Sequence, residues 1–250
     1  MATELVVCCF FWLDPARQRH VQLTPEDVRI WKAMVDRNLT IPHRTVCVTH
    51  RPDLIDFMET VPLDLAKHVP GTCLVKLQAH KIGGVAKEGE RVWLMDIDCV
   101  VTGSLDPLVS RDEPMVFFKN PNFAVGGRRG FIQGSLQLFT VGATEFLHRE
   151  FDPQRSMGWI NRRFGGAEQC WISERMNTSY PDPGWEWDVP YWCEADGVYG
   201  AGRLFNGKMG AGVTGELPPN ARIVVTPGDR SPSQPEFMAR HPWSARYYHA

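Results

Sequence analysis

The sequence lacks the features of a secreted or membrane-spanning protein. Its start, MATELVVCCFF, contains no basic stretch and no small-residue cleavage site. No apolar run approaches the roughly 20 residues that a membrane-spanning helix needs. We therefore expect a soluble protein of the cytoplasm.

The chain also lacks paired cysteines and a strong net charge. Its seven cysteines are odd in number, mostly lie in apolar runs and never follow C-x-x-C spacing, so we expect reduced core residues. The formal net charge is -2, which provides no overall field toward nucleic acid or membrane, although a local patch is compatible with it. Repeats and low-complexity tracts are absent. With 250 residues, of which 43% are hydrophobic, the chain suits one large domain.

Strand-like and helix-like segments alternate in the first half, which is typical of an α/β fold with a mostly parallel central sheet. The apolar run ELVVCCFF suits a strand covered on both faces. Thr24 and Pro25 form an N-cap and a first helical position. The helix that follows has one apolar face, made of Val28, Trp31, Val35 and Leu39.

Further elements are predicted from the same patterns. Strands are expected at 44–49 and 91–95, and a helix at 72–83. The Gly-rich segment 120–134 is predicted to be a mobile loop, followed by a strand at 135–141 and a helix at 167–176. A late strand is expected near Arg222. The aromatic cluster of Trp185, Trp187, Tyr191 and Trp192 fits a core better than a sugar-stacking surface.

Two carboxylates, Asp96 and Asp98, interrupt the apolar run VWLMDIDCVV. They follow a predicted buried strand, and the carboxyl ends of strands are where open α/β sheets bind ligands. If the chain curls there, both side chains reach one cation, and carboxylate oxygens suit Mg²⁺ or Mn²⁺, whose remaining positions substrate phosphates commonly fill. The alternative is a surface turn in which Asp98 caps the following segment, but the apolar residues on both sides favour a metal site.

The segment RVWLMDIDCVVTGSLDPL resembles the D-x-D segment of GT-A glycosyltransferases. The resemblance is closest to glycosyltransferase family eight, which contains glycogenin-like and bacterial galactosyltransferase-like enzymes, and to its phage and bacterial relatives. It covers most of the chain in order. Its other segments are VVCCFFW, HRTVCVTHRPD, LVKLQAHK, FIQGSLQLF, GGAEQCWIS and ARIVVTPGDRSP.

The resemblance implies a single GT-A domain over residues 1–250 with a Rossmann-like sheet. Residues 1–110 would form its nucleotide-binding half and residues 111–250 its acceptor-binding half. Asp96 and Asp98 would hold Mn²⁺ or Mg²⁺. The donor, a nucleoside diphosphate sugar, would meet Phe11, Trp12, Thr49, Lys76, Asp96, Ile97, Asp98, Gln133, Ser135 and Arg230.

Glu168 and Gln169 stand where the family has its Asp-Gln pair, which makes them the candidate catalytic residues. A carboxylate or amide near the anomeric carbon is what an oxocarbenium-like transition state needs. The alternative for Glu168 is an exposed acid that favours the helix dipole from the first turn.

The chain departs from the family near its C-terminus. The family's metal-binding His and phosphate-binding Lys fall on Val225 and Ser231, which cannot perform those roles. Arg230 is the candidate substitute for the lysine. Asp229, His241 and His249 are the candidate substitutes for the histidine.

The leading hypothesis is metal-dependent transfer of a sugar to an acceptor hydroxyl, with retention of anomeric configuration implied by the resemblance. Inversion is expected instead if Glu168 acts as a base beside the acceptor hydroxyl. A nucleotidyltransferase that makes nucleotide sugars is one alternative, but WLDPARQRH lacks the Gly-rich loop of that class. The other alternative is a non-catalytic nucleotide-sugar binding module.

Basic residues outnumber acidic ones between Lys119 and Arg163, seven to three. Two Arg pairs are the candidate acceptor-binding residues: Arg128 with Arg129, and Arg162 with Arg163. They favour a phosphate-bearing acceptor, either a hydroxymethylated pyrimidine in DNA or a lipid-linked or saccharide acceptor. A phage-encoded enzyme would act on DNA in the host cytoplasm. The alternative is a solubilising surface.

Overall fold

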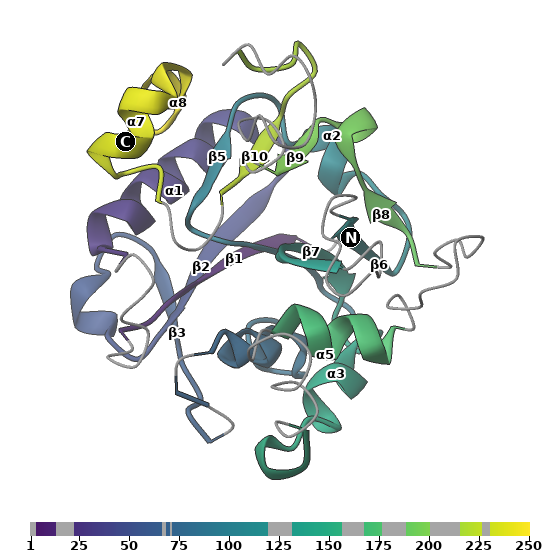
Figure 1. Ribbon diagram of the computed structural model, residues 1–250. Helices are drawn as coiled ribbons and strands as arrows, with labels where there is room; N and C mark the ends of the chain where they lie inside the picture. The colour runs from purple at the N-terminus through teal and green to yellow at the C-terminus, as the bar shows by residue number, and fades with distance from the viewer. Residues whose placement is uncertain are drawn as a thin grey trace.

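The computed structural model describes residues 4–13, 23–66, 69–70, 72–119, 132–156, 168–176, 189–200, 216–226 and 231–250, apart from the side chain of Arg240. These residues form two β-sheets with helices on both sides of the larger one (Figure 1). Short helical turns lie in the connections: η1 (Pro52–Leu54), α2 (Asp106–Val109) and η3 (Glu194–Asp196).

The central sheet has seven strands in the order β3-β2-β1-β4-β7-β6-β8. Strands β1 to β4 run parallel, and β7 is antiparallel to both of its neighbours. The sheet is therefore mixed but mostly parallel, which confirms the predicted fold class. Its strands are β1 (Leu5–Phe11), β2 (His43–Thr49), β3 (Glu59–Pro62), β4 (Arg91–Met95), β6 (Met115–Lys119), β7 (Ile132–Thr140) and β8 (Tyr191–Trp192).

Alternate residues of β1 face opposite sides of this sheet, as strand geometry requires. Val7 and Cys9 pack in one core cluster with helix α1, whereas Val6 and Cys8 pack in a second cluster on the other side. Since β1 is buried along its whole length, a continuous apolar run was the correct signal for this strand.

Helix α1 (Pro25–Asn38) starts as predicted. The Thr24 side chain accepts a hydrogen bond from the Asp27 backbone N–H, and the Asp27 carboxylate accepts from the Thr24 backbone N–H at 2.7 Å. This reciprocal capping satisfies two donors that a helix start otherwise leaves unpaired. The buried face of α1 consists of Asp27, Val28, Trp31, Met34 and Val35.

The opposite side of the sheet carries η2 (Leu74–His80), α3 (Glu145–Arg149) and α5 (Glu168–Arg175) (Figure 1). The helix predicted over 72–83 is a seven-residue 3₁₀ helix, shorter than expected, and all seven residues are buried. A 3₁₀ helix has three residues per turn and rises about 2.0 Å per residue, so it is slimmer and longer than an α-helix of equal length.

A second, smaller sheet has the order β5-β10-β9. Its strands are β5 (Cys99–Val101), β9 (Val198–Gly200) and β10 (Ile223–Val225), of which β10 is the predicted late strand. Helices α7 (Pro235–Arg240) and α8 (Pro242–Tyr247) follow, and the Arg37 guanidinium of α1 donates to the carbonyls of Tyr247 and His249. The C-terminus therefore packs against α1.

The Gly-rich segment contains a correction. Residues 132–134, expected at the end of a mobile loop, are the first residues of strand β7; residues 120–131 lie outside the described residues. The register between β6 and β7 jumps from Phe117↔Gln137 to Phe118↔Gln133. Residues 134–136 consequently have no registered partner on β6.

Three expectations from the sequence concern the cysteines, the aromatic cluster and membrane-spanning helices. All seven cysteines lie within the described residues and none forms a disulfide, as predicted. Trp192, also described, is 1% exposed and lies 6.3 Å from Trp93 between ring centroids, which confirms its place in the core. Among the helices of the described ranges, none is long and apolar enough to cross a membrane.

Candidate functional site

The two carboxylates of the D-x-D segment lie where the chain passes from one sheet to the other. Asp96 directly follows β4, and the chain turns at Ile97 and Asp98 before β5 begins. The Asp96 N–H donates to the Ser135 carbonyl at 2.9 Å, and the Thr226 hydroxyl donates to the Asp98 carbonyl at 2.6 Å. The chain thus curls at the strand end, which is the condition stated for both side chains to reach one cation, and the curl interrupts the side-chain alternation of a strand.

A buried lysine lies beside these acids. The Lys76 ammonium contacts both carboxylate oxygens of Asp96 at 3.0 Å and the Glu168 carboxylate at 2.5 Å. Lys76 and Glu168 are 4% and 3% exposed, and the Asp96 side chain is 23% exposed. Elements η2, β4 and α5 thus bring three residues from distant parts of the sequence into one charged cluster, which we call the Lys76 cluster.

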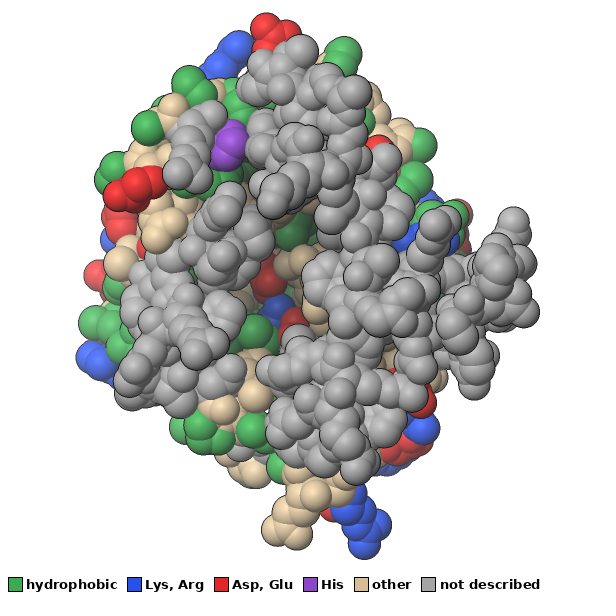
Figure 2. Space-filling view, in the orientation of Figure 1, with side chains coloured by type: hydrophobic (Ala, Val, Ile, Leu, Met, Phe, Trp, Pro, Cys, Tyr) green, Lys and Arg blue, Asp and Glu red, His purple; other side chains and the backbone are tan. Residues whose placement is uncertain are grey.

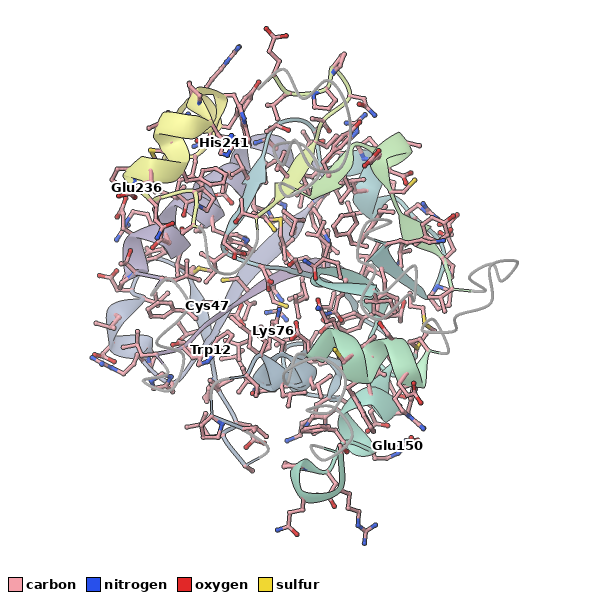
Figure 3. The ribbon with its side chains drawn as sticks, in the orientation of Figure 1. Trp12, Cys47, Lys76, Glu150, Glu236 and His241 are labelled. Carbon is pink, nitrogen blue, oxygen red and sulfur yellow. The ribbon has the colours of Figure 1, made fainter. Side chains whose placement is uncertain are left out.

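The Lys76 cluster lies at the middle of the molecule rather than at its rim. Figure 3 shows Lys76 near the centre, with Glu150, Glu236 and His241 toward the periphery. The same face is hollowed near its centre in Figure 2, and acidic and basic side chains lie together at the bottom of that hollow. Open α/β sheets bind ligands at this edge, beyond the carboxyl ends of the parallel strands.

Burial and the neighbouring charges shift the pKa values of Lys76 and Glu168 in opposite directions. Burial disfavours the charged form of Lys76, but Asp96 and Glu168 outweigh it and raise the pKa of the lysine well above its usual range. Burial raises the pKa of Glu168, although the Lys76 ammonium opposes that shift. Lys76 therefore stays protonated around pH 7, and its ammonium favours the ionised form of Glu168 against the effect of burial.

Gly134 is required by the close approach of Glu168. A Cβ atom at residue 134 would lie 2.2 Å from Oε1 of Glu168 and 2.9 Å from its Cδ. Only a glycine lets the carboxylate reach Lys76 along this backbone. The structure thus overturns the alternative of Glu168 as an exposed acid, because its carboxylate points inward.

The other predicted donor residues in the described ranges lie along the same strand ends. Phe11 is 1% exposed and Ile97 is 2% exposed, and both pack in the core cluster under α1. Thr49 is buried, and its hydroxyl accepts from the Arg51 N–H at 2.9 Å. Trp12 is half-buried.

Strand β7 and helix α5 carry the remaining predicted site residues, which are Gln133, Ser135 and Gln169. Ser135 is buried and bonds Asp96 through its carbonyl. The half-buried Gln133 side chain accepts from the Gly134 N–H at 3.0 Å. Gln169 is half-buried in the first turn of α5, next to Glu168.

Several predicted residues fall outside the described residues. They are Arg128, Arg129, Arg162, Arg163, Trp185, Trp187, Asp229 and Arg230. Three other members of the basic stretch are described: the Lys119 ammonium lies 4.3 Å from the centroid of the Tyr191 ring, Arg149 forms ion pairs with Glu145 and Glu150, and Arg155 lies 3.7 Å from Asp152. Arg149 and Arg155 therefore fit the alternative of a solubilising surface, because both lie beside acidic side chains.

The described candidates near the C-terminus for the family's His and Lys positions lie in different surroundings. Val225 is 2% exposed and pairs with Cys99 in the small sheet, so it provides no ligand. Ser231 is buried, and its hydroxyl lies 2.8 Å from that of Ser233. His241 packs 4.6 Å from the Phe237 ring, and in Figure 3 it lies well apart from Lys76. His249 is exposed at the chain end.

The donor atoms present suit a hard divalent cation. Asp96 and Asp98 offer carboxylate oxygens, and a carboxylate has lone pairs for a cation besides those that face Lys76. Within the described ranges, no group of three or more His, Cys, Asp or Glu side chains is arranged to hold a metal ion. Carboxylate oxygens are the ligand type that Mg²⁺ and Mn²⁺ prefer, so the chemistry of these two residues fits such an ion.

Reasoning from the sequence missed a second set of polar residues behind this cluster. His80, Gln137 and Thr144 are each 0% exposed and hydrogen-bonded to one another in series. The available signal was a histidine and a glutamine inside segments that are otherwise apolar, since buried polar side chains must find partners.

The fold of the chain is similar to solved glycosyltransferases. The galactosyltransferase LgtC, in complex with donor and acceptor sugar analogs, matches with a TM-score of 0.56 and 10% identity over 98% of this chain and 97% of that one. An active-site mutant of LgtC matches with a TM-score of 0.56 and 12% identity over 96% and 95%. The glycosyltransferase GlyE of Streptococcus pneumoniae TIGR4 matches with a TM-score of 0.58 and 11% identity, over 97% of this chain and 60% of that one.

No protein-family model matches the chain, and no curated protein matches its sequence. At 10% to 12% identity, the structural likeness establishes the fold. The chain has the GT-A fold that the motif resemblance implied, with the D-x-D segment at the end of β4.

Proposed function

We propose that this protein is a metal-dependent glycosyltransferase that moves a sugar from a nucleoside diphosphate sugar to an acceptor hydroxyl. The observation that carries the proposal is the buried Lys76 cluster at the carboxyl edge of a sheet with the GT-A fold. Galactosyltransferase LgtC, whose structure was solved with donor and acceptor sugar analogs, has the same fold over nearly its whole length. The cluster supplies charged groups where such a donor would lie.

In this proposal Asp96 and Asp98 hold Mn²⁺ or Mg²⁺ beside the donor diphosphate. When bound, the metal supplies a Lewis acid that stabilises the charge of the departing diphosphate. Lys76 holds the Asp96 carboxylate in place through two contacts of 3.0 Å. Because the lysine remains protonated, it also offsets negative charge on the donor.

Glu168 and Gln169 are the proposed catalytic residues, since they begin α5 beside Gly134. A carboxylate near the anomeric carbon stabilises positive charge that develops as the leaving group departs. Lys76 orients Glu168 through the 2.5 Å ion pair and keeps its carboxylate against β7. Retention of configuration remains the expected outcome from the motif resemblance. A product of inverted configuration would instead assign Glu168 as a base.

The chemical class of the acceptor is proposed from the positive charge of two Arg pairs in the sequence. The Arg pairs at 128–129 and 162–163 favour a phosphate-bearing acceptor, with hydroxymethylated pyrimidine in DNA as the first candidate and lipid-linked or saccharide acceptors as the second. Because docking to DNA releases counterions, transfer to such DNA should weaken steeply with added salt. A non-catalytic nucleotide-sugar binder is the alternative function, favoured by the absence of a third metal ligand from the described residues.

Incubation with Mn²⁺ and a panel of nucleoside diphosphate sugars tests these functions. A glycosyltransferase should hydrolyse its donor slowly without an acceptor and faster with the correct one. A binding module should bind the same compound in calorimetry without turnover. A nucleotidyltransferase should release pyrophosphate from a nucleoside triphosphate and a sugar phosphate, an outcome that would reject the proposal.

A further inference from the structure

The buried polar side chains behind Lys76 form a continuous chain of hydrogen bonds. The Thr144 hydroxyl lies 2.8 Å from Nδ1 of His80, and Nε2 of His80 lies 2.9 Å from Oε1 of Gln137. Gln137 then donates from Nε2 to the Gly134 carbonyl at 3.0 Å. The chain ends on the carbonyl oxygen that also lies 3.5 Å from the Lys76 ammonium.

The direction of each bond follows from what each group is able to do. The Gly134 carbonyl only accepts, so the Gln137 amide nitrogen faces it and the amide oxygen faces His80. His80 therefore donates from Nε2 and accepts from the Thr144 hydroxyl at Nδ1. Burial lowers the pKa of His80 to about 3, so the ring is neutral around pH 7.

The Gly134 carbonyl depends on this arrangement because of the local sheet geometry. Residues 134–136 lie where the β6–β7 register jumps, so β6 offers no registered partner there. A buried carbonyl without a partner is costly, and the Gln137 amide satisfies this one. His80 lies on η2 with Lys76, and Gln137 lies on β7 with Gly134, so the bonds brace the two elements across the site.

We propose that Gln137, oriented by His80, is a positioning residue for Lys76. It fixes the Gly134 carbonyl as a further oxygen facing the ammonium, and it fixes the backbone against which the Glu168 carboxylate packs. The proposal rests on the proposed function for its catalytic consequence, but the placement of Lys76 is testable without any turnover. The competing explanation is that these residues only satisfy one another in the core, with no effect on the site.

Three variants separate these explanations. Gln137→Met removes both hydrogen bonds with little change of volume. In its ionised form, Gln137→Glu keeps an acceptor for His80 but removes the donor to Gly134, so it isolates the bond on which the proposal depends. Gln78→Met is the matched control: Gln78 lies on the same 3₁₀ helix and is 6% exposed, and its side-chain bonds to the described residues go to backbone groups, the Pro62 carbonyl and the Asp64 N–H.

The first measurement is proton exchange of the Lys76 ammonium in protein labelled with ¹⁵N-lysine, with the signal assigned by its loss in Lys76→Arg. Wild type and Gln78→Met should show the same slowly exchanging ammonium. In Gln137→Met, exchange should be at least tenfold faster. Unchanged exchange in a folded Gln137→Met protein would overturn the proposal. If Gln137→Glu fails to fold, Gln137→Met decides alone.

The second measurement separates kcat from binding. With an active wild type, Gln137→Met should lower kcat at least tenfold while the Kd of UDP or GDP with Mn²⁺ rises by a smaller factor than kcat falls. Equal kcat in wild type and Gln137→Met would overturn the positioning role even if the ammonium exchange responds. If wild type turns over no nucleotide sugar, the proposed function fails, whereas the exchange measurement still decides whether Gln137 positions Lys76.

Discussion

Lys76 and Glu168 come from different elements, η2 and α5, and their charged groups meet at 2.5 Å in the interior of the protein. A buried charge is stable only with a partner, so each of these side chains holds the other in the site. Asp96 adds a second carboxylate to the same ammonium. Since two acids share one lysine, the cluster depends more on Lys76 than on either acid.

Lys76→Met should therefore destabilise the protein by about 3–5 kcal/mol, the usual effect of removing one partner of a buried ion pair. Adding Glu168→Gln should recover part of that loss because one unpaired carboxylate disappears. Urea unfolding of the single and double variants measures both effects. Lys32→Met is the control: its exposed ion pair with Asp36 should contribute only about 0.3–0.5 kcal/mol. Equal losses at Lys76 and Lys32 would contradict a buried cluster.

Gly134→Ala should displace Glu168, because the added Cβ would lie 2.2 Å from its carboxylate oxygen. We expect at least a tenfold loss of turnover and a destabilisation of about 1–3 kcal/mol, typical of overpacking. Gly89→Ala is a matched control, since Gly89 has a φ of +83° and no atom within 4 Å of the added Cβ. That variant should lose stability through backbone strain yet keep full turnover. Turnover that survives in Gly134→Ala would argue against a role for Glu168.

His80 should make the stability of the protein depend on pH below neutrality. Its pKa is lowered to about 3, from an ordinary value of 6.5, by burial and to a lesser extent by His148, while Gln137 opposes the shift. In the unfolded chain His80 binds a proton below about pH 6.5, whereas in the folded protein it stays neutral down to about pH 3. The contribution of His80 to the free energy of unfolding is therefore complete above pH 6.5 and falls as the pH drops toward 3. Between pH 7 and pH 5 the loss from this group should be about 2 kcal/mol.

His80→Phe tests that assignment, because a phenyl ring retains the packing against Phe139, whose centroid lies 4.4 Å from the imidazole. The variant should unfold more easily at pH 7 but show a flatter decline toward pH 5. His249→Phe, at the exposed chain end, should keep the wild-type slope. A wild-type slope in His80→Phe would place the titration elsewhere.

The sequence predicted those parts of the fold whose physics is local. Helix α1 was predicted from Thr24 and Pro25, and strand β1 from an unbroken apolar run. Both predictions were possible because capping and burial each require particular residue types at neighbouring positions. Asp96 and Asp98 were proposed as metal ligands because charge is rare inside apolar runs. The pairing of Glu168 with Lys76 was not predictable, since it depends on how α5 docks against η2. The His80–Gln137 contact was hidden for the same reason.

Asp98→Ala and Asp96→Ala should separate metal binding from cluster stability. Asp96 neutralises Lys76 through two 3.0 Å contacts, so its removal should weaken both the fold and the Mn²⁺-dependent binding of a nucleoside diphosphate. Asp98→Ala should abolish that binding and all turnover yet leave unfolding close to wild type. Removing one of two like charges at a metal-free site relieves repulsion and should not weaken the core.

Asp36→Ala, on the exposed face of α1, provides the control for carboxylate removal. Calorimetry with UDP or GDP, with and without Mn²⁺, combined with urea unfolding, measures both properties. Mn²⁺-dependent binding that persists in Asp98→Ala would remove this residue from the metal site, and normal turnover would end the metal hypothesis for the D-x-D segment.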